Sequence, residues 1–425
     1  MYKITLFFIG ICLYGFTAGQ TNYAYEETVA RAGLFHLQKN YKEAIPLFEK
    51  AFQIQQPDAL NAYKAAGVYV LDSNIDRAFF YLDLALKLGW RETEALNTDP
   101  YFDYLRAAAS QRWMQLIHSA TVLEQRYARS LKLPGLRKRI NDLGLRDQRL
   151  RYARIQAHDQ AEMQRIDHQL LLSDSANLAQ AKIIIRTYGW PKISEVGKDG
   201  QNNLWLIVQH ADNDVFFQKA VLSAMRKLDG THELNTENYA FLYDRVQCNL
   251  NYKQLYGTQV NWTAKGEATG FRSILDENKV DERRHALGLL RLKIYALTYG
   301  FQYSPVSAEE AAAEARSDSL YVKRLIDSAK YWYTHNDFQK VYDQYNTAST
   351  FLSGMSNSDN FEAALLFARI AIRDHNDRYR SISLDFLNLL LQRGELTKKA
   401  LNRHRPFQVL QEEPRWTAIY SHLSR

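Results

Sequence analysis

Two stretches near the start of the chain repeat one another at a fixed offset of 34 residues, and this repeat constrains the fold more than any other feature. Small residues recur in both copies where two helices would touch, and large residues recur where a groove would be filled. The matched residues are Ala32, Gly33, Phe35, Ala44, Phe48 and Ala51 in the first copy and Ala66, Gly67, Tyr69, Ala78, Leu82 and Ala85 in the second. A helical hairpin with this pattern cannot bury its apolar face alone, so the sequence predicts hairpins that stack.

A third element follows the repeats and has a counterpart near the C-terminus. In residues 94–117, Asp99-Pro100 is expected to begin a helix whose large apolar residues would cover the end of a stack. Its residues match a later stretch at an offset of 305, with Trp113 and Trp416 aligned after a deletion of two residues. The matched residues are Ala95, Leu96, Asn97, Phe102 and Leu105 with Ala400, Leu401, Asn402, Phe407 and Leu410.

A weaker likeness links the first repeat to a segment upstream of this second capping element. It pairs Asn40, Tyr41, Ala44 and Ala51 with Asn360, Phe361, Ala364 and Ala371. The residues 356–360 are interpreted as an inserted turn between these helices. Taken together, the matches predict repeat-like helices at both ends of the chain.

The flanks of the chain resemble tetratricopeptide repeats of bacterial envelope proteins, because of their 34-residue period and their alternation of small and large residues. The resemblance implies stacked hairpins whose groove suits an extended peptide or a partner helix.

The first residues have the pattern of a secretory leader. Lys3 is followed by the apolar run Ile4 to Phe16 and by the small residues Thr17-Ala18-Gly19, which predicts a signal peptide at 1–19 and export to the periplasm or beyond. An uncleaved anchor is the alternative, whereas a lipoprotein signal is excluded because Ile11 precedes Cys12. No later apolar run is long enough for a transmembrane helix.

The net charge of +7 is concentrated in one segment, where residues 126–154 hold ten Lys or Arg and two Asp. Such a stripe could bind nucleic acid, but an exported protein is not expected to meet that partner. An acidic glycan or a lipid headgroup fits the compartment better, and a solvated helix face is the simplest alternative. The basic residues are Arg126, Arg129, Lys132, Arg137, Lys138, Arg139, Arg146, Arg149, Arg151 and Arg154.

The middle of the chain follows a different pattern. The apolar spacing predicts helices at 136–172, 177–188, 201–210, 214–228, 237–250 and 281–299, with breaks at 173–175 and at Gly189-Trp190-Pro191. Two segments, 253–262 and 271–275, are rich in aromatic and β-branched residues and predict a small β-hairpin.

These patterns predict a mainly α chain with stacked helical hairpins at both ends, flanking a mostly helical central domain with one small β-hairpin. The expected divisions are a signal peptide at 1–19, N-terminal repeats with a capping helix at 20–120, a central domain at 131–300 and C-terminal helices with a capping element at 315–425.

The central segment contains an ordered series of short motifs. They are Asp147-Gln148 with Arg151, Gly189-Trp190-Pro191, Val196-Gly197, 205–212 (WLIVQHAD), Phe217-Gln218, 239–246 (YAFLYDRV), 254–259 (QLYGTQ), 281–284 and 287–289. In this series the segment resembles a bacterial family of unknown function, DUF6624. The resemblance implies an architecture and supplies no activity and no catalytic residues.

One hypothesis places a hydrolase-type site in the central domain. A histidine near carboxylates could act as a general base while an arginine holds an anion, which makes His210, Asp212, Asp244 and Arg245 the catalytic candidates. The candidate ligand-binding residues are Asp147, Arg151, Gln209, Tyr256 and Gln259. Asp147 and Arg151 are four residues apart, so they share a helix face and can pair.

The alternative is a buried polar network that only supports the fold. Asp–Arg pairs would join crossing helices, Gln209-His210 would bond the last carbonyls of a helix, and Asp212 to Asp214 would cap the next one. The sequence lacks HExxH, GxSxG, P-loop and paired CxxC motifs, so neither a metal nor a cofactor is expected.

The first function hypothesis is therefore an exported helical-repeat scaffold that binds a protein or peptide partner. The second is a hydrolase-type enzyme around His210 and Asp244. The third is binding of an acidic glycan by the basic stripe at 137–154.

Overall fold

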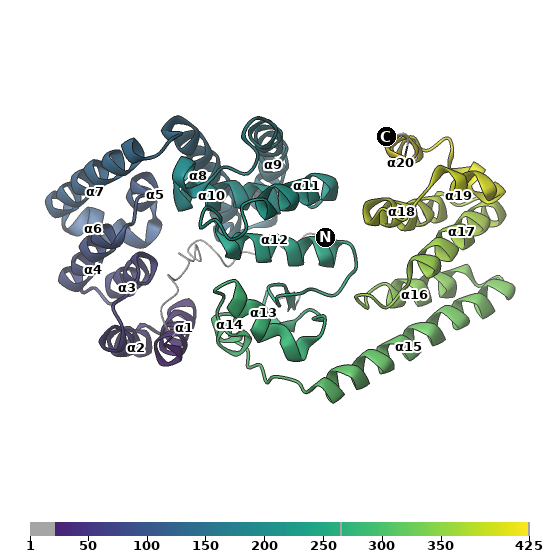
Figure 1. Cartoon of the computed structure of the whole chain (residues 1–425), viewed down its shortest axis with the longest axis horizontal. Helices are drawn as coiled ribbons and strands as arrows, with labels where there is room; N and C mark the ends of the chain where they lie inside the picture. Colours follow the sequence, from purple (N-terminus) through teal and green to yellow (C-terminus); the bar gives the residue numbers. More distant parts are fainter. Residues whose placement is uncertain (1–21, 264–265, 424–425) are drawn as a thin grey trace. The chain divides into compact units, whose positions relative to one another are not determined.

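The computed structural model describes residues 22–263 and 266–423, and within them it is mainly helical with one antiparallel pair of short strands (Figure 1). The predicted fold class is therefore confirmed for the described residues. None of the helices described combines the length and the apolar character needed to cross a bilayer. The predicted signal peptide at 1–19 lies outside the described residues.

The described chain divides into two compact units. The first holds the described residues up to Tyr243, within Tyr256–Arg272 and in Lys279–Pro305, and the second holds Asp244–Leu255, Ser273–Asn278 and the described residues from Val306. The N-terminal repeats thus share a unit with most of the central segment.

Two helical hairpins open the first unit, and their turns are built alike. They consist of α1 (Tyr23–Leu37) with α2 (Tyr41–Ile54) and α3 (Ala59–Leu71) with α4 (Ile75–Leu88). In each turn one residue, Lys39 or Ser73, has a left-handed φ of 59°. The next residue, Asn40 or Asn74, donates its N–H to a carbonyl of the preceding helix at 2.8 Å. The repeat in the sequence is therefore also a repeat in backbone geometry.

The small residues of the repeat lie in the core. Ala32, Ala44, Ala66 and Ala78 are completely buried and belong to one hydrophobic cluster that also holds the large residues of the pattern. Because both hairpins share this core, α2 also packs against α3. The prediction that the two hairpins stack is confirmed.

The predicted capping element follows the hairpins. It comprises α5 (Thr93–Thr98), the 3₁₀ turn η1 (Pro100–Phe102), α6 (Asp103–Ala108) and α7 (Ser110–Ser130). Asp99 caps the 3₁₀ turn by accepting the N–H of Tyr101 at 2.9 Å. Phe102, Leu105 and Trp113 are buried in the same core as the repeats, as a covering element requires.

Three long helices follow, and the break between the first two differs from the prediction. They are α8 (Pro134–Gln156), α9 (Gln160–Tyr188) and α10 (Ile193–Gln209). The chain breaks at 157–159, where Asp159 caps α9 by accepting the N–H of Glu162 at 2.7 Å. Ser173 and Ser175, the predicted breakers, lie inside α9. Serine only weakly disfavours a helix interior, whereas an aspartate cap positively fixes a helix start.

Two glycines are required by close packing around α10, and the first of them allows α8 and α10 to approach closely. A Cβ on Gly144 would lie 2.2 Å from the side-chain oxygen of Asn203. Gly197 bends α10 with a φ of 78°, and a Cβ there would lie 2.4 Å from a carboxylate oxygen of Asp199. Side chains larger than hydrogen are excluded at both positions.

The rest of the central segment consists of shorter elements. They are α11 (Val215–Arg226), α12 (Thr236–Asn249), β1 (Val260–Trp262), β2 (Ala268–Phe271), η2 (Glu277–Lys279), α13 (Val280–Ala286) and α14 (Leu292–Thr298). The strands pair antiparallel, with Val260 opposite Phe271, which confirms the predicted hairpin. The helix predicted at 281–299 is interrupted, because Gly288 takes a left-handed φ of 69° between α13 and α14. Helix α14 packs against α1 within the first unit.

The second unit contains the C-terminal helices. They are α15 (Ala308–Thr334), α16 (Phe338–Ala348), α17 (Asn357–Asp374), α18 (Asp377–Arg393), α19 (Lys398–Arg403), the 3₁₀ turn η3 (Arg405–Leu410) and α20 (Pro414–His422). Helices α15 and α16 pair, as do α17 and α18.

The C-terminal turn that matches the N-terminal ones lies elsewhere than predicted. Asn336 has a φ of 59°, and Asp337 donates its N–H to the carbonyl of Trp332 at 3.1 Å and caps α16. The counterpart of Asn40 is therefore Asp337 and not Asn360. Asn360 is buried in the first turn of α17, where its side chain bonds the carbonyl of Ser356 at 2.7 Å.

The two capping elements match in structure as they do in sequence. The second runs through a short helix, a 3₁₀ turn and a final helix, which is the order of the N-terminal element without its helix α6. Phe102 lies 5.9 Å from Trp113 between ring centroids, and Phe407 lies 6.4 Å from Trp416, with tilted rings in both pairs. The prediction of a duplicated capping element is confirmed.

Candidate functional site

Three helices of the first unit bring four charged or titratable side chains together. Asp147 and Arg151 lie one turn apart on α8, Asp174 lies on α9, and His210 is the residue that ends α10. The chain thus forms the cluster from a local pair on one helix and from two residues that only the packing of the helices adds.

Arg151 lies at the centre of this cluster. Its Nε and Nη2 donate to the two carboxylate oxygens of Asp147, each at 3.0 Å, and Nη2 also donates to Asp174 at 2.6 Å. The other side of Asp147 faces His210, whose Nδ1 is 3.4 Å from Oδ1. The predicted Asp147–Arg151 pair is confirmed, and it is bidentate, the geometry in which arginine binds a carboxylate most strongly.

The environment separates the two carboxylates electrostatically. Burial alone would raise the pKa of Asp147, but the nearby His210 ring, together with Arg151, holds that pKa well below its usual range. The pKa of Asp174 is raised by burial, which Arg151 only partly offsets. Asp147 is therefore the permanently ionised member, and Asp174 is the one that takes up a proton more readily.

The pairing of Asp147 with His210 is the arrangement that orients an imidazole for proton transfer. A buried carboxylate 3.4 Å from Nδ1 stabilises the protonated form of the ring, while Nε2 is the nitrogen that could exchange a proton. The His210 side chain is 19% exposed, so the ring is accessible from outside the protein.

The same atoms have the spacing of a metal site. Asp147, Asp174 and His210 each offer one ligand atom, and these three atoms lie within 4.8 Å of one another. Arg151, however, already donates to both carboxylates, and a divalent cation would have to displace its guanidinium. The cluster therefore suits an ion-pair network around arginine better than a metal centre.

The corner that holds His210 in place is built by a residue on the next helix. Gln218, which is completely buried on α11, donates its side-chain N–H groups to the carbonyls of Val208 and Gln209 at 3.2 and 3.4 Å and to Asp212 at 3.5 Å. Gln209 and Asp212 thus support the corner, and the donor that satisfies the helix end is Gln218 rather than Gln209 or His210 itself.

The next helix is capped by a neighbouring aspartate. Asp214 accepts the N–H of Phe217 at 3.0 Å and pairs with Lys182 at 2.6 Å. The sequence interpretation of 212–214 as a cap is therefore confirmed, with Asp214 as the capping residue.

Other candidate residues lie outside this cluster. Asp244 and Arg245 belong to the second unit, where Asp244 is completely buried and accepts the N–H of Leu255 at 2.7 Å. In the first unit the carbonyl of Tyr256 accepts from Arg284 at 2.6 Å, and Gln259 donates to Thr258 at 3.1 Å. These bonds give Asp244 and Tyr256 roles in holding the chain that follows α12.

Asp174 is the member of the cluster that sequence reasoning missed. The sequence predicts a break between helices at 173–175, whereas Asp174 lies on a face of α9. A single sequence offers no signal that Asp174 meets Arg151, because the two lie on different helices, 23 residues apart.

Half of the cations of the basic stripe are paired with carboxylates within the protein. Five of its ten cations form ion pairs with carboxylates: Arg137, Lys138, Arg149, Arg151 and Arg154. Arg137 is buried and bonds Glu124 at 2.9 Å and Asp199 at 2.7 Å. The stripe is therefore not a uniformly solvated face, and two of its arginines, Arg137 and Arg151, hold helices together.

Comparison with known proteins bears on the central segment alone. Residues 134–303 match the model of a family of unknown function, DUF6624, and this range contains the whole cluster around Arg151. The match supports the resemblance drawn from the central motifs. No curated protein and no solved structure matches the chain.

Proposed function

We propose that this protein is an exported helical-repeat binding protein of the cell envelope and that its partner binds the C-terminal helices. Three features support this proposal: a leader-like N-terminal sequence, a tetratricopeptide-like 34-residue period, and a shared hairpin turn. This turn occurs in both the N-terminal array (α1 to α7) and the C-terminal array (α15 to α20). Repeat arrays of this kind typically serve as binding surfaces.

The observation that carries the proposal is the exposure of α15. This helix has 27 residues, of which Val322, Leu325, Ile326 and Ala329 are buried. Large apolar side chains remain in solvent, with Leu320 58% and Tyr331 54% exposed. A helix that leaves such side chains uncovered offers anchors for a partner helix or an extended peptide.

The N-terminal repeats also expose single apolar side chains, of which Phe80 at 52% is the most exposed on α1 to α4, but their helices are more enclosed. On α3, ten of the thirteen residues are buried, and α1 packs against α14. Most apolar residues of these repeats therefore serve the folding of the first unit, and the C-terminal helices, with the more exposed helix α15, are the preferred binding surface.

Site-specific crosslinking tests the proposal. A photoreactive amino acid at Tyr331, in the native envelope, is expected to capture a partner that can then be purified and bound to the chain in vitro. Leu320→Asp is expected to abolish that binding without altering the melting temperature, because an exposed substitution changes stability by about 0.5 kcal/mol or less.

The matched control lies on the N-terminal array. Met114 on α7 is 64% exposed, so a photoreactive residue or an aspartate there makes a similar change on the other surface. Equal capture from both positions, or binding that survives Leu320→Asp, would contradict the proposal.

A second candidate function is acid–base catalysis, favoured by the Asp147–His210 pair. In this mechanism His210 transfers the proton and Asp147 orients the His210 ring. Arg151 and Asp174 hold the carboxylate of Asp147 in place. A panel of chromogenic esters, phosphates and glycosides tests it. Any activity is expected to disappear in His210→Gln and Asp147→Asn, while Asp142→Asn, an exposed change on the same helix as Asp147, retains it. An activity indifferent to His210 would exclude the dyad.

Binding of an acidic glycan by the stripe at 137–154 has weaker support. Arg137 is buried, and Arg151 and three other cations of this segment pair with neighbouring carboxylates. Little unpaired positive charge is left there to attract an anionic polymer.

A further inference from the structure

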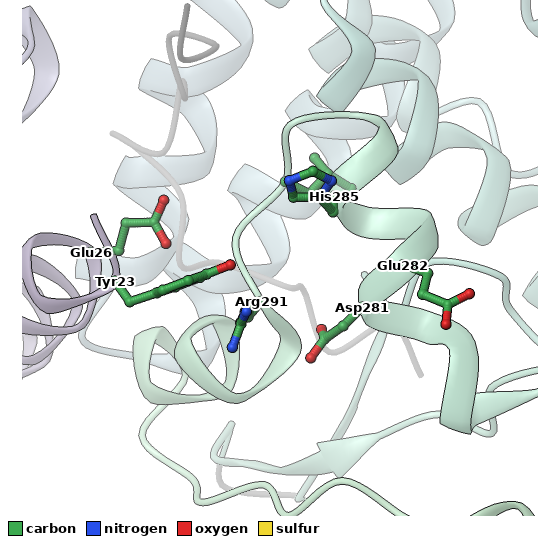
Figure 2. Close-up of a pocket in the computed structure, with 7 residues that line it drawn as sticks. Tyr23, Glu26, Asp281, Glu282, His285 and Arg291 are labelled. Atoms are coloured by element: carbon green, nitrogen blue, oxygen red, sulfur yellow. The ribbon is translucent and has the colours of Figure 1, made fainter. Parts of the chain in front are cut away.

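A pocket of about 520 Å³ lies in the first unit between α1 and the chain from α13 to α14 (Figure 2). Its volume is in the range of sites for small molecules. Apart from one leucine, the side chains that line it are polar or aromatic: Tyr23, Glu26, Asp281, Glu282, His285 and Arg291.

Glu26 is the acceptor that this pocket leaves unsatisfied. The residue is only 5% exposed, and among the described residues its carboxylate makes no hydrogen bond and no ion pair. Burial raises the pKa of Glu26, and the charge of Arg291 partly offsets this increase. A carboxylate held in a pocket without a partner is costly, and a ligand with an ammonium group would remove this cost.

Arg291 is the corresponding donor. Its guanidinium stacks on the ring of Tyr23, with the central carbon 3.7 Å from the ring centroid. Stacking uses the face of the guanidinium and leaves its N–H groups in the plane for hydrogen bonding. Within the described part of the chain these N–H groups have no hydrogen-bond acceptor.

The other charged groups of the lining set the polarity of the pocket. Asp281 is already used, because it accepts the N–H of Leu292 at 2.7 Å at the start of α14. In Figure 2, Tyr23, Glu26 and Arg291 are grouped together, whereas Glu282 points away from them. Glu26 and Arg291 are therefore an acceptor and a donor that lie close together in the pocket, and His285 is a further polar group of the lining.

We propose that this pocket binds a small zwitterion, an amino acid or a dipeptide, with its ammonium group at Glu26 and its carboxylate at Arg291. The two side chains line one pocket without bonding each other, so a ligand with both charges satisfies both. Tyr23 supplies a flat wall beside the ligand. This site does not depend on the partner surface of α15, which lies in the other unit.

Calorimetric titration of the full chain with three probes tests the proposal. L-alanyl-L-alanine carries both charges, its N-acetyl derivative lacks the ammonium group, and its C-terminal amide lacks the carboxylate. The dipeptide is expected to bind, and each blocked form is expected to bind at least about tenfold more weakly, since each loses one charge-assisted bond. Absence of heat with all three probes, or equal affinities, would overturn the proposal.

Two variants assign the charges. Glu26→Gln is expected to weaken binding of the dipeptide about tenfold and to leave binding of the N-acetyl derivative unchanged. Arg291→Gln is expected to weaken binding of the dipeptide about tenfold and to leave binding of the C-terminal amide unchanged. Glu27→Gln is the matched control, because Glu27 is the next residue on α1 and pairs with Arg31 on the surface at 2.7 Å. An effect of Glu27→Gln as large as that of Glu26→Gln would refute the assignment.

Discussion

The two ends of this chain are built from the same parts and put them to different use. Both contain a hairpin turn with a left-handed residue at φ 59°, and both finish with a capping element in which a tryptophan packs on a phenylalanine. In the N-terminal array α3 is almost wholly buried, whereas in the C-terminal array α15 is mostly exposed. A repeat pattern thus specifies the hairpin but not the use of its outer face.

The physical cause lies in what the first unit packs onto its repeats. Arg137 donates to the carbonyl of Arg91 at 2.8 Å, Arg149 pairs with Glu94 at 3.0 Å, and Asn203 donates to Glu92 at 3.4 Å. The capping element of the N-terminal array is therefore bonded directly to α8 and α10. The N-terminal hairpins are therefore a structural part of the first unit, together with the central segment.

The largest expected effect comes from removing the phenylalanine at the centre of each cap. Phe102→Ala and Phe407→Ala each delete a completely buried ring and are expected to cost about 3–5 kcal/mol. Hydrogen exchange of each variant measures where this loss appears. Phe102→Ala is expected to raise exchange in α8 and α10 as well as in α1 to α7, and Phe407→Ala only in the second unit. Identical exchange patterns for the two variants would break the comparison.

A methyl group at the crossing of α8 and α10 is the next test. Gly144→Ala would place a Cβ 2.2 Å from Asn203, the residue that bonds Glu92 at the base of the N-terminal cap. The expected destabilisation is about 1–3 kcal/mol, measured by urea unfolding. Gly135→Ala in the same helix is the control, because no atom lies within 4 Å of its Cβ position. Equal stabilities of the two variants would show that the crossing tolerates a wider spacing.

The charge of Glu237 predicts a dependence of stability on pH that sets the first unit apart. Burial raises the pKa of this residue to about 8, with Arg284 and Lys64 of α3 partly offsetting it. The folded protein then keeps a proton that the unfolded chain has lost, so stability falls as the pH rises from about 4.5 to about 8, by at most about 1.4 kcal/mol per pH unit.

Glu237→Gln is expected to remove this fall. Unfolding free energies measured at about pH 5 and about pH 8 should then differ less than in the unmodified protein. Glu309→Gln, an exposed change at the start of α15, is the control and should leave the difference unchanged. A Glu237→Gln variant with the same slope as the unmodified protein would mean that this carboxyl is ionised in the folded state.

The smallest effect concerns the turns. Lys39 and Asn336 occupy the same left-handed position in the two arrays, but asparagine tolerates this conformation better than lysine. Lys39→Gly is expected to stabilise the first unit by about 0.5–1 kcal/mol, and Asn336→Gly to change the second by less. Thermal unfolding followed by circular dichroism measures both. A larger gain at Asn336 would show that the two turns are strained differently despite their equal φ angles.

Regular features of the fold could be predicted because they are local in sequence. The 34-residue offset located the first two hairpins, and the match of Phe102 and Trp113 to Phe407 and Trp416 located both caps. The prediction of the C-terminal turn failed because more than one asparagine in this region could mark a turn. The C-terminal turn was placed at Asn360, although Asn336-Asp337 carries the matching geometry.

The candidate site shows the same division. Asp147 and Arg151 could be paired from their spacing on one helix, and His210 could be proposed from its place at a helix end. Asp174 could not be found, because its contact with Arg151 depends on how α8 and α9 pack. Asp244 had the appropriate chemistry for catalysis, yet it is buried and bonded to the backbone of Leu255.

The sequence by itself determined most of the helical segments and the small residues that the first two hairpins bury, since periodicity and capping act within a few residues along the chain. Tertiary structure alone decided which arrays are enclosed, which carboxylates meet Arg151, and that Glu26 and Arg291 line one pocket. Those outcomes depend on contacts between helices far apart in the sequence, and the residues adjacent in the sequence do not specify such contacts.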